Sequence, residues 1–148
     1  MGRKTKITLI ILGFTLLGMQ VIRPDRTNPV SDPALTYEAI EKPAPERSAV
    51  LRRACANCHT NETEWPWYSH IAPVSWLVAN DVKEAREHLN LSEWGRLSPD
   101  KRAKALEEMC EEASHGDMPP WEYRLLHREA KLGEQGVGAI CAAIPEKK

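Results

Sequence analysis

The stretch "CANCHTNETEWPWYSH", residues 55–70, decides how the rest of this chain is interpreted. It places two thiols and an imidazole close together, at Cys55, Cys58 and His59, and three aromatic rings and a second imidazole follow. Three kinds of site combine two cysteines with an adjacent histidine: a covalently attached haem, a zinc ion and a redox-active dithiol. The remainder of the sequence has to distinguish among these three sites.

The bulk properties and the hydrophobic periodicity predict one small all-α domain. With 148 residues there is room for one domain plus a tail or anchor, and a formal net charge of −1 indicates no nucleic-acid partner. No segment has the alternation of a β-strand, whereas helical spacing recurs along the chain. The predicted helices cover residues 45–58, 73–91, 98–116 and 121–127, with a weaker, glycine-containing one at 133–144.

The first residues are typical of a membrane anchor. A basic head, Arg3, Lys4 and Lys6, precedes an uncharged and mostly apolar run over residues 7–22. We therefore expect residues 1–22 to form an uncleaved signal anchor, a transmembrane helix with its N-terminus in the cytoplasm. The protein would then be a single-pass protein of the bacterial cytoplasmic membrane, with its domain on the periplasmic side. A cleaved signal peptide, leaving a soluble periplasmic protein, is the alternative.

Residues 23–44 contain four prolines and no sustained periodicity. This composition predicts an extended linker between the anchor and the folded domain. The domain itself is expected over residues 45–148.

The CxxCH pattern favours haem over the two other sites. Two cysteines three apart can take thioether bonds from the two vinyl groups of a haem, and the next histidine can then coordinate the iron. A structural zinc site needs four protein ligands, and a thioredoxin-like dithiol expects a βαβ context that this chain lacks. The sequence therefore predicts haem c attached through Cys55 and Cys58, with His59 as proximal iron ligand, assembled by the cytochrome c maturation machinery.

Met118 is the predicted distal ligand of the iron. Its thioether lies in a loop that Pro119 and Pro120 stiffen, because proline restricts φ. His70 and His115 are the rival ligands. Ligation by methionine and histidine raises the reduction potential and suits a one-electron carrier.

Aromatic residues and two further cysteines complete the candidate site. The rings of Trp65, Tyr68 and Trp76 are predicted to cover the haem, with ordinary core packing as the alternative. Cys110 and Cys141 lie outside the motif. In an exported protein they would either form a disulfide or remain as buried thiols.

Two segments of the chain resemble a known family. Residues 55–94, with CxxCH and "WPWYSHIAPVSW", and residues 116–132, with "MPPW", resemble the haem-binding domain family of bacterial exported proteins. The resemblance implies a small monohaem, cytochrome-c-like domain with an N-terminal anchor. It also implies covalent haem through Cys55 and Cys58, His59 as proximal ligand and Met118 as distal ligand. The similarity runs from about residue 47 to 132, and the glycine-containing tail departs from the family pattern.

Electron transfer is the expected function, with redox partner proteins in the periplasm or the membrane. A haem-based sensor, in which a small ligand displaces a labile sixth ligand, is the alternative, and a zinc or interaction protein is a third. An enzyme is not expected, because no acid/base pair accompanies the motif.

Overall fold

The computed structural model describes residues 2–144, and these are helical without a β-strand, as predicted. Residue 1 and residues 145–148, the ends of the predicted anchor and domain, lie outside the described residues. The α-helices are α1 (Arg3–Met19), α2 (Tyr37–Glu41), α3 (Pro45–Ala54), α4 (Ala56–His59), α5 (Val74–His88), α6 (Pro99–His115), α7 (Trp121–Leu126) and α8 (Glu134–Cys141). Short 3-10 turns are η1 (Pro33–Leu35), η2 (Trp67–His70), η3 (Leu91–Arg96) and η4 (Arg128–Ala130).

Helix α6 begins and ends at the residues that the sequence indicates. The Ser98 hydroxyl accepts a hydrogen bond from the backbone N–H of Lys101, and Pro99 occupies the first helical position, where no N–H is required. Gly116 ends the helix with a φ of 79°, a left-handed conformation that glycine adopts without a steric cost.

The helix predicted over residues 45–58 is interrupted within the motif. Cys55 has a φ of −119° and separates α3 from α4. Its carbonyl oxygen accepts hydrogen bonds from the backbone N–H groups of Cys58, at 3.2 Å, and His59, at 2.9 Å. Cys58 and His59 therefore lie on a new turn, one that can point away from the axis of α3.

A buried aromatic pair forms the centre of the main core. Trp94 is fully buried, and its ring meets that of Tyr37 edge to face, with ring centroids 4.9 Å apart. The indole N–H of Trp94 donates to Glu41 Oε1 at 2.7 Å. Leu51 and Leu106 belong to the same cluster, so the cluster joins α2, η3, α3 and α6.

Tyr37 and Glu41 lie in the segment for which an extended linker is predicted, and that segment differs from the expectation. Residues 33–41 are helical and pack into the core, and only residues 23–32 are extended. The physical reason is that a proline can also begin a helical turn. Pro33 occupies the first position of η1, and Asp32 is its N-cap.

The extended residues also lie against the folded body. The Trp76 indole donates to the Ile22 carbonyl oxygen at 2.7 Å, Arg26 donates to the Ser69 carbonyl oxygen at 2.6 Å, and Arg86 donates to Asn28 Oδ1 at 2.8 Å. The segment is therefore docked along η2 and α5, and it is not a free spacer.

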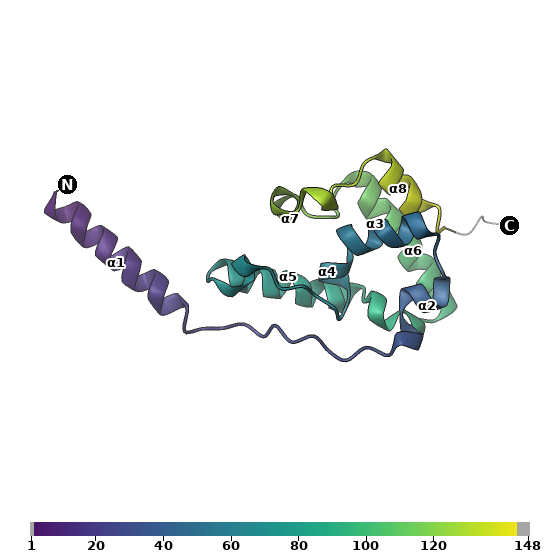
Figure 1. Ribbon diagram of the computed structural model, residues 1–148, viewed down its shortest axis with the longest axis horizontal. Helices are drawn as coiled ribbons and strands as arrows, with labels where there is room; N and C mark the ends of the chain where they lie inside the picture. The colour runs from purple at the N-terminus through teal and green to yellow at the C-terminus, as the bar shows by residue number, and fades with distance from the viewer. Residues whose placement is uncertain (1, 145–148) are drawn as a thin grey trace.

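Helix α1 stands apart from the rest of the molecule (Figure 1). None of its residues is buried, and it includes the three basic residues of the N-terminal head. Within residues 2–144, none of the helices combines the length and the apolar character that a membrane crossing requires. The transmembrane helix predicted over residues 1–22 is therefore not found.

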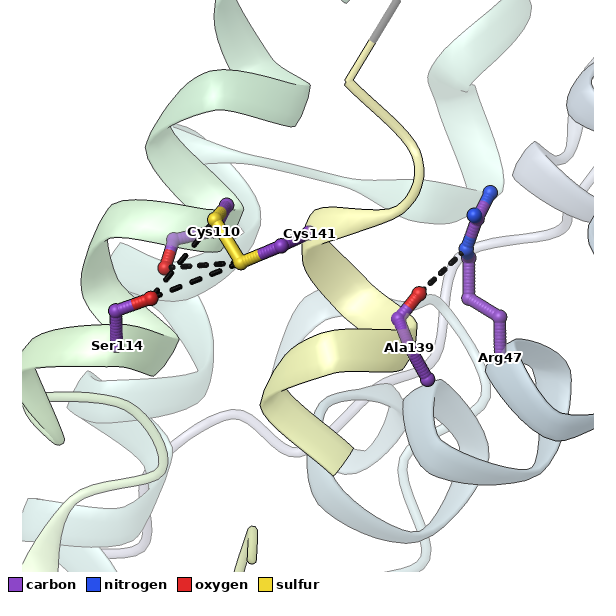
Figure 2. Close-up of a disulfide and its surroundings, with 5 residues drawn as sticks. All are labelled: Arg47, Cys110, Ser114, Ala139 and Cys141. Atoms are coloured by element: carbon purple, nitrogen blue, oxygen red, sulfur yellow. Dashed lines mark hydrogen bonds between the residues drawn. A yellow bond between two sulfur atoms is a disulfide. The ribbon is translucent and has the colours of Figure 1, made fainter. Parts of the chain in front are cut away.

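Cys110 and Cys141 form a disulfide that joins α6 to α8, as Figure 2 shows. The Ser114 hydroxyl lies 3.6 Å from Cys141 Sγ, and the Arg47 side chain donates to the Ala139 carbonyl oxygen at 2.8 Å. Helix α8 is thus attached to α6 covalently and to α3 by a hydrogen bond. These links hold in place a helix whose glycines make it intrinsically weak.

Removing the disulfide is expected to destabilise the fold. The bond joins two cysteines that are 31 residues apart in the sequence. For a loop of this length the chain-entropy relation gives a stabilisation of roughly 3–4 kcal/mol. The double substitution Cys110→Ser and Cys141→Ser should lower the free energy of unfolding by that amount in a denaturant titration. Wild-type protein treated with dithiothreitol should show the same loss, and equal stability with and without the bond would contradict the prediction.

Candidate functional site

Two adjoining cavities meet at the CxxCH motif, and together we call them the slot. Their volumes are about 600 Å³ and 650 Å³, within the range of small-molecule and cofactor sites. Six residues line both cavities: Cys55, His59, Glu87, His88, Met118 and Pro119. The structure therefore brings Met118 to the motif although the two are far apart in sequence.

Both cavities of the slot are mainly apolar, and charged residues contribute to each. The first cavity is lined by aliphatic side chains from several elements, among them Leu89, Leu97, Leu132 and Ile140. The second is lined by Cys58 of the motif, by Tyr123 of α7 and by acidic residues of α5 such as Asp81. Helices α5 and α7 extend on the same side of α3 and α4 (Figure 1). The slot can therefore accept a large apolar ring, and charged residues of both cavities, such as Lys101 and Asp81, are available to its polar groups.

His59 is held in the tautomer that a metal ligand needs. Its Nδ1 lies 2.9 Å from the Leu89 carbonyl oxygen, which can only accept, so Nδ1 carries the proton and donates. Nε2 is then left with a free lone pair. Burial lowers the pKa of His59 below its ordinary value of 6.5, and the carbonyl contact opposes that shift only in part. The imidazole is therefore neutral at neutral pH.

Cys55 and Cys58 are unpaired thiols in the structure. Burial raises the pKa of Cys55 to about 12, and the neighbouring Cys58 adds to the shift. Burial, helped by the carboxylate of Asp81, raises the pKa of Cys58 to about 11. Both thiols therefore stay protonated at neutral pH, which disfavours a reactive dithiol, since the thiolate is the nucleophile.

A zinc site finds no support in the described part of the chain. Among residues 2–144, no group of three or more histidine, cysteine, aspartate or glutamate side chains is arranged to hold a metal ion.

Met118 follows the end of α6, where its backbone N–H donates to the Glu112 carbonyl oxygen at 3.2 Å. The peptide bond to Pro119 is cis, and Pro119 is buried. The rival ligands His70 and His115 are exposed, and they line neither cavity of the slot. Of the three predicted distal ligands, only Met118 is placed with His59.

The predicted aromatic cover is only partly placed at the slot. Trp65 and Trp76 line a separate cavity of about 540 Å³, between α5 and the extended segment, which contains neither the motif residues nor Met118. Tyr68 lies nearer, because its hydroxyl is 2.7 Å from Nε2 of His127, and His127 stacks on the slot residue Tyr123.

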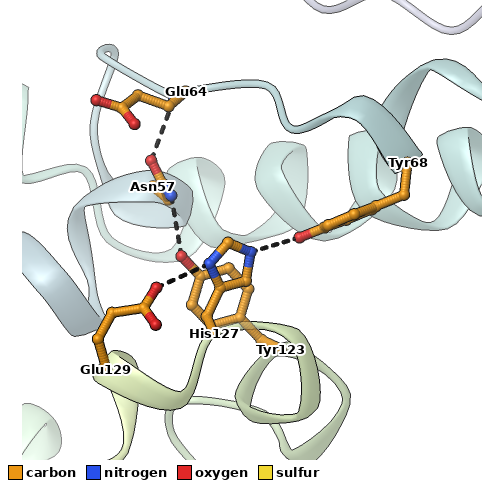
Figure 3. Close-up of polar contacts among 6 residues, drawn as sticks. All are labelled: Asn57, Glu64, Tyr68, Tyr123, His127 and Glu129. Carbon is orange, nitrogen blue, oxygen red and sulfur yellow. Dashed lines mark hydrogen bonds and ion pairs between the residues drawn. The ribbon is translucent and has the colours of Figure 1, made fainter.

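Several residues of the site carry no local sequence signal. Asn57 Nδ2 donates to the Tyr123 hydroxyl at 2.9 Å, and the Tyr123 ring stacks on His127 with centroids 4.2 Å apart. These contacts, drawn in Figure 3, join residues far apart in the chain. The one available hint is that Asn57 lies between the two cysteines of the motif. His88 also lines both cavities, and no sequence motif includes it.

The residues present fit a haem with two thioether links. Two unpaired thiols, an imidazole with Nε2 free and a thioether line one slot whose first cavity is largely apolar. Histidine and methionine are ligands that cytochromes c use for haem iron.

Comparison with known proteins gives one match. A family model described as a haem-binding domain matches residues 14–145, a range that includes the motif, Met118 and both disulfide cysteines. No curated protein and no solved structure matches the chain.

Thiol alkylation of the haem-free chain should reveal the raised pKa values. Relative to an ordinary value of 9.0, a pKa of about 11 lowers the thiolate fraction of Cys58 at pH 8 about a hundredfold, and Cys55 is shifted further. Iodoacetamide should therefore modify both thiols at least tenfold more slowly in the native chain than in guanidinium.

The pH dependence of the same chain has a definite sign. Above about pH 9 the unfolded chain loses thiol protons that the folded chain keeps, so the free energy of unfolding should fall as pH rises from 9 toward 11. Equal alkylation rates in the native and denatured chain would contradict the assigned environment of the thiols.

Proposed function

The chain belongs to the haem-binding domain family, and on that premise we propose that it is a monohaem, cytochrome-c-like electron carrier. Haem is attached through Cys55 and Cys58, with His59 and Met118 as iron ligands. The observation that carries the proposal is that His59 and Met118 line the same two cavities, beside both thiols.

Haem, when bound, supplies a one-electron couple at its iron. The chain's own groups orient and tune it. The Leu89 carbonyl oxygen fixes the His59 ring through Nδ1 and raises the basicity of Nε2. The Met118 thioether favours a higher potential than a second imidazole would. The aliphatic wall of the first cavity limits the access of water.

A second candidate is a haem-based sensor with a labile sixth ligand. Two observations support this candidate. Met118 is 40% exposed, and helix α7, which follows Met118, has no buried residue. A carrier keeps both axial ligands during turnover, whereas a sensor exchanges one of them. The rate of carbon monoxide binding to the reduced protein separates these functions, since a firmly held methionine makes binding slow and a labile one makes it fast.

The proposal includes a place in the cell. The exposed apolar side chains of α1, which follow a basic head, support attachment of the protein to the bacterial cytoplasmic membrane, with the haem body in the periplasm. Loading by the cytochrome c maturation machinery and electron exchange with periplasmic or membrane redox proteins would follow. We expect a carrier without enzymatic turnover of its own.

Covalent attachment is the first testable consequence. Protein made in cells that contain the maturation machinery should carry the added mass of one haem, and the haem should resist extraction by acid acetone. Substitution of both Cys55 and Cys58 by serine should make the haem extractable or absent. A mature wild-type chain without added porphyrin would end the proposal.

Replacing Met118 by alanine should change the iron's sixth coordination position. We expect loss of the six-coordinate low-spin spectrum of the wild type and a fall in reduction potential of roughly 0.2 V, part of the ~0.8 V range that axial ligands cover. His70→Ala and His115→Ala are matched controls, which should leave the spectrum unchanged. If a histidine control alters the spectrum and Met118→Ala does not, the ligand assignment is wrong.

A further inference from the structure

The segment that carries Met118 is weakly packed, and we call residues 117–126 the distal arm. Helix α7, which forms most of it, has no buried residue. Its apolar side chains Trp121, Leu125 and Leu126 are each at least 60% exposed. Pro119 is the one buried residue of the arm, so apolar burial contributes little to the position of α7, and other contacts must hold that helix.

Two hydrogen bonds connect the end of the arm to α4 and to η2 (Figure 3). The Tyr123 hydroxyl accepts from Asn57 Nδ2 at 2.9 Å, and Asn57 belongs to α4, between the two motif cysteines. His127, directly after α7, has its Nε2 2.7 Å from the Tyr68 hydroxyl of η2. We call these two contacts the clasp.

Each contact of the clasp is oriented by a further partner. Asn57 Oδ1 accepts from the backbone N–H of Glu64 at 3.1 Å, so its amide nitrogen faces Tyr123. His127 Nδ1 lies 3.0 Å from Glu129 Oε1 and donates to that carboxylate, which leaves Nε2 to accept from Tyr68. Burial raises the pKa of Tyr68 to about 12, so its hydroxyl keeps the proton that it donates. The stacked rings of Tyr123 and His127 couple the two contacts.

We propose that Tyr123 and His127 are positioning residues, which hold the distal arm against Asn57 and Tyr68 and thereby keep Met118 opposite His59. This inference rests on the proposed function, because it concerns how the sixth ligand is kept in place. The clasp needs no haem for its own formation, since all of its partners are side chains of this chain. It ties the arm to the same turn that carries the attachment cysteines.

The proposal predicts how easily the arm opens. The loss of one neutral hydrogen bond shifts an equilibrium by about two- to tenfold. Tyr123→Phe and Tyr68→Phe each remove one contact of the clasp and keep the ring. In the reduced holoprotein, carbon monoxide should therefore bind about two- to tenfold faster in each variant than in the wild type.

Tyr37→Phe is the matched control, because Tyr37, the remaining tyrosine of the chain, packs against Trp94 in the core and lines neither cavity of the slot. It should leave carbon monoxide binding unchanged. The unfolding equilibrium should shift by no more than the same two- to tenfold in Tyr68→Phe and Tyr123→Phe, and a larger shift would indicate a general loss of stability in place of a positioning role.

Hydrogen exchange gives a second measurement that does not depend on the iron ligand. The backbone N–H groups of Arg124 and His127 bond to the carbonyl oxygens of Pro120 and Tyr123. Their exchange should be faster in both phenylalanine variants of the clasp. Unchanged exchange overturns the clasp, even if carbon monoxide binds faster, because access would then open elsewhere.

The outcome for Met118→Ala separates the two proposals. If this variant binds carbon monoxide faster than the wild type but the clasp variants do not, the positioning role is wrong and Met118 remains the ligand. If Met118→Ala binds carbon monoxide at the wild-type rate, the ligand assignment fails and so does the role in keeping that ligand. In that case the hydrogen-exchange measurement tests only whether the clasp holds the arm.

Discussion

The hydrogen bond from His59 Nδ1 to the Leu89 carbonyl oxygen is the contact on which the site depends. It joins the short turn that carries the motif to the residue that ends α5, and it fixes both the direction and the tautomer of the imidazole. Without it the ring could rotate, and Nε2 would not be reliably presented to the slot. The interruption of the helix at Cys55 makes this contact possible, because it allows the turn that carries His59 to point away from the axis of α3.

The rest of the fold supports the slot and leaves it accessible. The Trp94 and Tyr37 pair joins η3 to α2. The Cys110–Cys141 bond holds α8 against α6, and Ile140 of α8 lines the first cavity. The distal side is built differently, since α7 has no buried residue and is joined to the body by polar contacts. One side of the slot is therefore rigid through apolar packing, and the other depends on a few hydrogen bonds.

The features that could be predicted rest on local signals. The cap, the first-turn proline and the final glycine of α6 lie within or beside that helix, so its ends could be predicted from the sequence. Tyr37 could not be placed, because its burial depends on Trp94, far along the chain. The buried face of α5 could not be predicted either. Val74 and Leu77 are exposed at 42% and 55%, whereas Ser75 is buried, because hydrophobic periodicity identifies a helix but does not say which face has a neighbour.

The sequence by itself determined the helical class and the CxxCH group, because each depends on residues close together in the chain, whereas the structure decided that Met118, and not His70 or His115, lies with His59. Only the tertiary structure decided that Trp65 and Trp76 lie at another cavity and that Cys110 pairs with Cys141. It also decided that Asn57 meets Tyr123 and that Tyr68 meets His127, beside the second cavity of the slot. Such contacts depend on the packing of distant elements against one another, and the spacing of residues along one segment contains no information about them.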